Sequence, residues 1–186
     1  MNDSLSANAA NSNPFARPSA LDYHFPPFDQ IRDEHYEPAF EQGMADHRAE
    51  IELIANNPEP ATFENTLVAM ELSGQLLSRV ASVFYGLSSA HTNDEIEAIQ
   101  ARIAPTLAAH QDAITLDPRL FARINTLYAE RESLGLDAES MRLLTETHRD
   151  FVRAGALLSD TEKDRMKAIN SKMAELQTAF SQNVLA

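Results

Sequence analysis

Apolar residues recur at steps of three and four along this 186-residue chain from about residue 34 onward. That spacing gathers side chains on one face of an α-helix, whereas a half-buried β-strand needs strict alternation. The chain contains only 5 glycines, and 44% of its residues are apolar, which is too many for a disordered protein. We therefore predict an all-α fold, a helical bundle with a core of its own.

Helix-starting signals divide this pattern into about six helices. Serine, threonine and aspartate side chains accept hydrogen bonds from the first backbone N–H groups of a helix, and proline fits the first turn. One helix begins near residue 34, and the others follow Thr62, Thr92-Asn-Asp-Glu95, Asp117-Pro118, Asp137 and Ser159-Asp-Thr-Glu162. The segment 62–90 is apolar nearly all round, so we expect it at the centre of the bundle. No apolar run reaches the ~20 residues that span a bilayer.

The first 33 residues differ from the rest. Asn, Ser and Ala dominate residues 1–13, which predicts a disordered leader. Residues 14–33 carry four prolines, which fix φ and push the preceding residues into extended conformations. Aromatic side chains are frequent in the same segment, so we expect an extended Pro-rich arm lying on a core, with a mobile tail as the alternative. The helical N-terminal domain is then predicted over 34–186.

The last predicted helix has the clearest apolar stripe. Its members are Met166, Ile169, Met173, Leu176, Phe180 and Val184. The stripe continues to the end of the sequence without a Gly or Asn cap. We expect the chain to be a fragment ending inside a helix, with an exposed patch at Met173, Leu176 and Phe180 that drives self-association. The alternative is a natural terminus whose last helix packs on this domain alone.

Charge and cysteine content narrow the expected partners and compartment. The formal net charge is −13, from 15 Lys+Arg and 28 Asp+Glu. Such a surface repels phosphate groups, so neither nucleic acid nor an anionic membrane is an expected partner. Cysteine is absent, which excludes disulfides, thiol nucleophiles and thiolate zinc sites. The first residues also lack the features of a signal peptide, so we expect a cytoplasmic protein.

The residue types that usually carry chemistry form no recognisable site. No two of the six histidines lie three or four residues apart, and His-Glu-x-x-His is absent. His47 and His148 lie on apolar stripes, where we expect hydrogen-bonded core histidines. Neither a Gly-x-Ser-x-Gly elbow nor a Gly-rich phosphate loop occurs. We therefore predict no catalytic residue, no cofactor-binding residue and no metal ligand in this chain.

Several short motifs follow one another in the order and spacing of one peptidase family. They are Phe25-Pro-Pro-Phe-Asp-Gln-Ile31, Glu34-His-Tyr-Glu-Pro-Ala-Phe40, Asn57-Pro58, Thr62-Phe-Glu-Asn-Thr66, Phe84-Tyr-Gly-Leu-Ser-Ser-Ala-His-Thr-Asn93, Asp137-Ala-Glu-Ser140, Phe151-Val-Arg-Ala-Gly155 and Phe180-Ser-Gln-Asn183. Each piece is weak alone, but their succession over roughly residues 14–186 is specific. The chain resembles the N-terminal region of the thimet oligopeptidase family, and within it the bacterial peptidyl-dipeptidases.

This resemblance implies part of a zinc metallopeptidase with a nearly all-helical, two-lobed fold around a deep channel. In the family, a His-Glu-x-x-His helix and a downstream glutamate hold the zinc, and no residue of this chain matches those positions. The implied activity is removal of C-terminal dipeptides from short peptides. The chain would form part of the channel wall, pack on the missing catalytic domain and be inactive alone. The alternative is a self-contained helical interaction module, an adaptor or regulator without enzymatic activity.

Overall fold

A computed structural model describes residues 13–185 of the chain, with side chains to residue 184. The predicted leader, apart from Asn13, lies outside the described residues. All regular secondary structure in the described part is helical, which confirms the all-α fold. The α-helices are α2 (Tyr36–Ala55), α3 (Ala69–Leu72), α4 (Gln75–Ala90), α5 (Asp94–Thr115), α6 (Pro118–Glu130), α7 (Ala138–Ala154) and α8 (Asp160–Leu185). Shorter helical turns are η1 (Asp22–His24), η2 (Asp33–His35), η3 (Glu64–Val68, a π-helix) and η4 (Arg131–Ser133).

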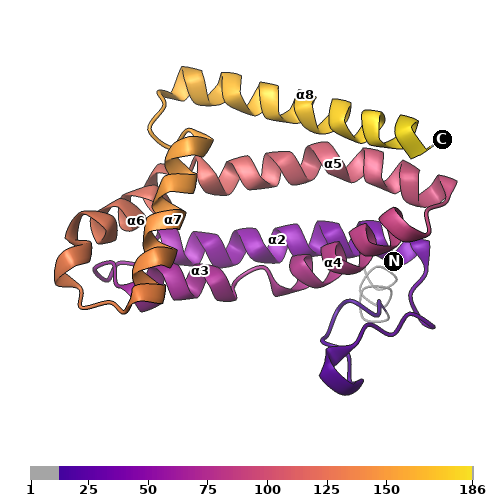
Figure 1. Cartoon of the computed structure of the whole chain (residues 1–186), viewed down its shortest axis with the longest axis horizontal. Coiled ribbons are helices and arrows are strands. Elements are labelled where there is room, and N and C mark those ends of the chain that lie inside the picture. Colours follow the sequence, from indigo (N-terminus) through magenta and orange to yellow (C-terminus); the bar gives the residue numbers. More distant parts are fainter. Residues whose placement is uncertain (1–12, 186) are drawn as a thin grey trace, which may run out of the picture.

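Helix α2 forms the centre of the bundle (Figure 1). It contacts α3, α4, α5 and α6, while α8 lies along the outer side of α5. Helices α6 and α7 pack together at one end, and the N-terminal arm extends from the other end. The prediction that segment 62–90 occupies the centre is therefore wrong, because α4 packs mainly on α2.

Segment 62–90 is not one helix, because the chain turns at Ser73 and Gly74. Gly74 has a φ of +69°, a left-handed conformation that side chains disfavour, and its N–H donates to Glu50 Oε2 over 2.7 Å. The two halves of the segment therefore present different faces to the bundle. This is why apolar residues occur all round the segment, although neither half is buried on all sides. By length and composition alone Glu64–Ala90 could cross a bilayer, contrary to our prediction. In the fold, its residues Val80 and Phe84 are buried in the core.

Most helix starts were predicted correctly because their signals are local. Asp117 accepts hydrogen bonds from the backbone N–H groups of Arg119 and Leu120, with Pro118 in the first turn of α6. Asp137 accepts in the same way at the start of α7. Helix α5 is capped one residue later than predicted, by Asn93 in place of Thr92. The Asn93 side chain also donates to Asp33 over 3.0 Å, which fixes it at this position.

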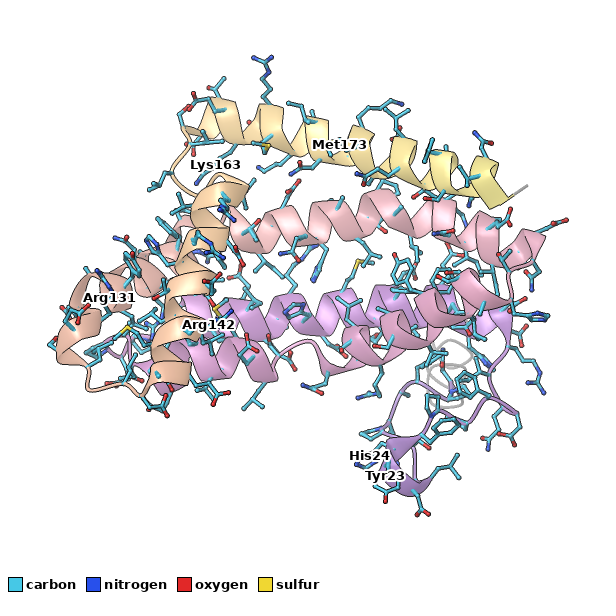
Figure 2. All side chains as sticks on the ribbon, viewed as in Figure 1. Tyr23, His24, Arg131, Arg142, Lys163 and Met173 are labelled. Carbon is cyan, nitrogen blue, oxygen red and sulfur yellow. The ribbon has the colours of Figure 1, made fainter. Side chains whose placement is uncertain are left out.

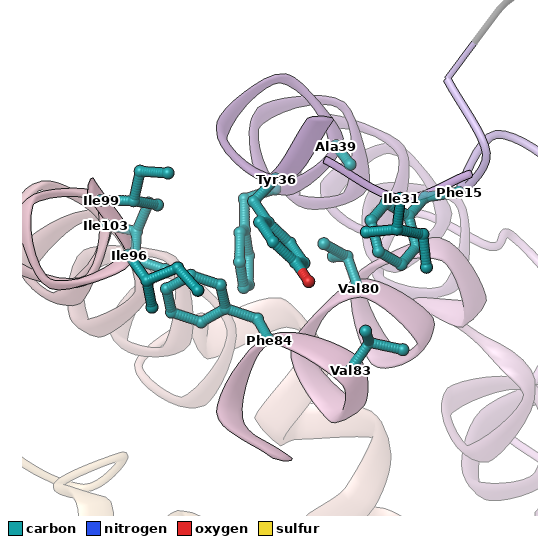
Figure 3. Packing of buried hydrophobic residues seen from close by; sticks show 11 residues of the cluster. Phe15, Ile31, Tyr36, Ala39, Val80, Val83, Phe84, Ile96, Ile99 and Ile103 are labelled. Atoms are coloured by element: carbon teal, nitrogen blue, oxygen red, sulfur yellow. The ribbon is translucent and has the colours of Figure 1, made fainter. Parts of the chain in front are cut away.

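The largest core cluster joins α2, α4, α5 and the N-terminal arm (Figure 3). The ring of Phe84 meets Tyr36 and Phe40 edge-on, with centroids 5.0 and 5.4 Å away. Edge-on aromatic pairs of this kind add to the stability gained by burial alone. Two further clusters fill the space among α2, η3, α6 and α7, and their fully buried members include Leu67, Leu120, Ile124, Leu127 and Leu144.

The Pro-rich arm buries apolar side chains in the core near its two ends. Phe15 and Ile31 are buried in the main core cluster. Between them the chain leaves the bundle, and Figure 2 shows Tyr23 and His24 at the tip of the arm. Both of these residues have positive φ, 57° and 55°, which is uncommon for residues other than glycine. The other large apolar side chains of the tip are also exposed, namely Leu21, Phe25 and Phe28.

Candidate functional site

The side of α8 that faces away from α5 carries an exposed apolar stripe. Its members are between 44% and 70% exposed: Ile169, Met173, Leu176, Phe180 and Val184. A stripe over these positions is about 22 Å long at 1.5 Å per residue. Figure 2 shows α8, with Met173 at its middle, at the outer edge of the bundle. The predicted exposure of this stripe is therefore confirmed.

The opposite side of α8 packs on α5 through polar side chains. Lys163 is buried and its Nζ donates to the carbonyl of Leu116, just beyond the C-terminus of α5, over 3.1 Å. A cation is favourable there because the last carbonyls of a helix are unpaired and carry partial negative charge. Further along, Asn170 donates to Asp112 Oδ1 over 2.7 Å, and Gln182 Nε2 donates to a backbone carbonyl of α5 over 2.8 Å.

This orientation is the reverse of a surface helix in a self-contained domain. Such a helix normally buries its apolar stripe and exposes its polar side. In α8 the polar positions that touch α5 and the apolar stripe lie roughly 120° apart around the helix axis, at 3.6 residues per turn. A long exposed apolar row marks a surface that another protein element covers. The stripe of α8 is therefore the candidate functional site of this chain, as a candidate interface.

No set of side chains in the described residues fits a zinc ion. Among residues 13–184, no three His, Asp or Glu side chains gather closely enough to hold a metal. The nearest approach of two histidines is His47 Nδ1 to His110 Nε2, at 3.0 Å. This is a hydrogen-bond distance, shorter than the about 3.3 Å between two nitrogen ligands of one tetrahedral zinc. The predicted absence of metal and catalytic residues stays a prediction, since the implied zinc would lie on other residues.

His47 of α2 and His110 of α5 form a half-buried pair instead. His110 is only 3% exposed, and its Nδ1 has no hydrogen-bond partner among the described residues. Burial lowers the pKa of His110 to about 4, helped by the nearby charges of His47 and Arg48. Burial also lowers the pKa of His47, although Glu50 opposes the shift. At neutral pH the pair is therefore uncharged, with one ring donating and the other accepting.

His148 lies in an aromatic stack on the surface between α6 and α7. Its ring is parallel to that of Tyr128, with centroids 3.9 Å apart, and its Nε2 is 3.1 Å from Asn125 Oδ1. Arg131 covers the Tyr128 ring at 4.3 Å from its centroid. Both His47 and His148 are within hydrogen-bond distance of a partner, as predicted, but neither is a core residue, because both side chains are only partly buried. His110 was not singled out from the sequence, although it lies seven residues after Ile103 and so continues the same helical face.

Comparison with known proteins identifies relatives along nearly the whole chain. No protein-family profile matches it. The chain is 46% identical to "Dipeptidyl carboxypeptidase" of Salmonella typhimurium over 176 residues, 95% of its length. It is 47% identical to the "Dipeptidyl carboxypeptidase" of Escherichia coli over 174 residues, 94% of its length. "Oligopeptidase A" of Haemophilus influenzae is more distant, with 28% identity over 86% of the chain.

The chain belongs to the thimet oligopeptidase family. It spans only 26% of the length of each of the two dipeptidyl carboxypeptidases. The relatives from this family therefore contain about three times as much additional sequence, which is ample to cover the exposed stripe of α8.

Proposed function

We propose that this chain is the N-terminal, channel-wall part of a zinc metallopeptidase that removes C-terminal dipeptides from short peptides. One observation carries the proposal: identity of 46–47% to two dipeptidyl carboxypeptidases over 94–95% of the chain. The activity is that of the relatives by name, and it passes to the whole protein of which this chain would be about a quarter. The chain itself contributes shape and an interface, and its compartment is the cytoplasm.

The exposed stripe of α8 receives the catalytic part in this proposal. Its five large apolar side chains would be buried against that part. Their burial would stabilise the contact by about 25 cal/mol per Å² of apolar surface removed from water. The polar contacts of Lys163 and Asn170 hold α8 on α5 with the stripe pointing outward before that part arrives. Zinc, bound by residues outside this chain, would supply the activated water.

The chain alone is inactive in this proposal. The purified 186-residue chain should release no dipeptide from a blocked short peptide with a free C-terminus, with or without added zinc, above the rate of a buffer blank. Escherichia coli dipeptidyl carboxypeptidase serves as the positive control under the same conditions. Zinc-dependent turnover by the chain alone would show that it contains a catalytic site and would overturn the proposal.

A further inference from the structure

A small cleft lies between the N-terminal arm and helix α4. It has a volume of about 210 Å³. Pro14, Phe15 and Pro26 line it from the arm, and Arg79 and Val83 line it from α4. Phe15 and Val83 are only 4% and 7% exposed, because both belong to the main core cluster. Pro14 and Pro26 restrict the backbone of the wall that the arm forms. This restriction favours a cleft that is formed before any ligand binds.

Arg79 is a partly buried charged group of this cleft, and it has no acidic partner among the described residues. Its Nη2 donates to the backbone carbonyl of Phe15 over 3.2 Å, and its buried Nε has no acceptor among the described residues. None of the ion pairs in the described part of the chain includes it. Burial lowers the pKa of Arg79, and no neighbouring charge counters that shift. Burying part of a guanidinium without a counter-ion costs free energy, and a bound anion would offset that cost.

The lining of the cleft selects for an anion. No Asp or Glu of the described residues lines it, although the chain has 28 Asp+Glu against 15 Lys+Arg. Two further basic side chains, Arg17 and His24, lie on its wall. The His24 ring is held by its Nδ1, which donates to the carbonyl of Ser19 over 2.9 Å. The local charge is therefore opposite to that of the protein as a whole.

We propose that this cleft binds a carboxylate carried on a small apolar group. Within the part of the chain that the structure describes, Nη1 and Nη2 of Arg79 keep N–H groups that can bind the two oxygens of a carboxylate. A carboxylate matches a guanidinium in geometry. The walls of Pro14, Phe15, Pro26 and Val83 take the apolar group. The carboxylate has two sources: a free acid, such as the last residue of a peptide, or an Asp or Glu side chain from the rest of a longer protein.

The test uses the 186-residue chain and 3-phenylpropanoate, with the uncharged amide 3-phenylpropanamide as its match. Binding is followed by NMR shifts of the backbone amides of Phe15, Arg79 and Val83. We expect saturable shifts with the acid and none with the amide. Arg79→Gln should weaken binding about tenfold or more, because charge-assisted hydrogen bonds are lost. Arg79→Lys should keep part of the affinity, because lysine keeps the positive charge but cannot donate two parallel hydrogen bonds as a guanidinium does.

The control variant is Arg165→Gln, which removes the same charge from an exposed position on α8 and should bind as the unaltered chain does. The inference is overturned by an absence of saturable shifts with the acid, by equal shifts with the amide, or by unchanged binding in Arg79→Gln. The unaltered chain alone decides the first two outcomes, so a variant that fails to fold does not prevent the test.

A second arm distinguishes the sources. The chain is joined to the remaining part of Escherichia coli dipeptidyl carboxypeptidase, and the same acid is titrated. Retained binding that depends on Arg79 identifies a free ligand. Loss of binding in the joined protein, with binding restored when that remaining part is removed by proteolysis, identifies a carboxylate of the protein itself.

Discussion

Gly43 of α2 lies directly against the backbone of Leu77 in α4. A β-carbon at Gly43 would sit 2.9 Å from both the Cα and the N of Leu77, closer than atoms normally approach. Backbone atoms cannot rotate away as a side chain can, so the two helices pack closely only because residue 43 has no side chain. This contact joins α2 to α4 beside the main core cluster, against which Leu77 packs.

Gly43→Ala should therefore destabilise the chain by about 1–3 kcal/mol, because α2 and α4 must separate to admit the methyl group. The matched control is Gly86→Ala in α4, where a β-carbon meets nothing within 4 Å. That substitution should stabilise by about 0.5–1 kcal/mol, since alanine favours helix over glycine. Urea unfolding followed by circular dichroism measures both. Equal effects of the two substitutions would contradict the close packing at Gly43.

Stability should fall as the pH is lowered from 7 to 5. The pKa of His110 is about 4 in the folded chain, against an ordinary value of 6.5. Between these values the unfolded chain binds a proton that the folded chain does not, so acid favours unfolding. The cost from His110 is about 2 kcal/mol between pH 7 and pH 5.

His110→Gln should remove most of that pH dependence, because glutamine does not titrate. His91→Gln, a substitution of an exposed histidine, is the control and should leave the slope unchanged. The free energy of unfolding is measured in urea at each pH. The same slope in His110→Gln as in the unaltered chain would show that His110 is not the group responsible.

Leucines of the stripe and of the core should respond differently to truncation. Leu176 is 57% exposed, so Leu176→Ala should change the stability of this chain by no more than about 0.5 kcal/mol. Leu120 is completely buried, and Leu120→Ala should cost about 2–5 kcal/mol. In a longer protein in which the stripe is covered, Leu176→Ala should rise to about the same 2–5 kcal/mol. Thermal and urea unfolding measure the loss of stability in Leu176→Ala and in Leu120→Ala. A large loss in Leu176→Ala of this chain would mean that residues of the chain itself cover the stripe.

The chain should self-associate through the stripe at high concentration. Light scattering should show an apparent mass that rises with concentration, and Leu176→Glu with Phe180→Glu should return the chain to a monomer. Ala168→Glu with Ala179→Glu adds the same charge at exposed positions of α8 beside the stripe, and should not. A strict monomer at every concentration, or equal effects of the two double variants, would count against the stripe as the contact surface.

Features set by neighbouring residues could be predicted from the sequence, and features set by distant residues could not. Asp117 and Asp137 cap their helices through backbone groups two or three positions away. The break at Gly74 depends on Glu50, 24 residues earlier, which binds the freed N–H, and the apolar pattern runs across it.

The same distinction holds for the candidate site. The exposure of Leu176 and Phe180 followed from an apolar stripe without a cap. The side of α8 that packs on α5 could not be predicted, because it depends on a hydrogen bond from Asn170 to Asp112, which is 58 residues away in the sequence. Likewise His47 and His110 are 63 residues apart, and only the packing of α2 on α5 brings them together.

The most direct test of the central claim is an exchange between relatives. The 174 matched residues of Escherichia coli dipeptidyl carboxypeptidase, 47% identical to this chain, are replaced by the chain, and dipeptide release from a blocked short peptide is measured. We expect release at a rate within about tenfold of the unaltered enzyme, and its loss, below about one hundredth of that rate, when Leu176 and Phe180 are both changed to Glu. An active exchange protein that is indifferent to those two changes would contradict the claim that the stripe of α8 seats the catalytic part.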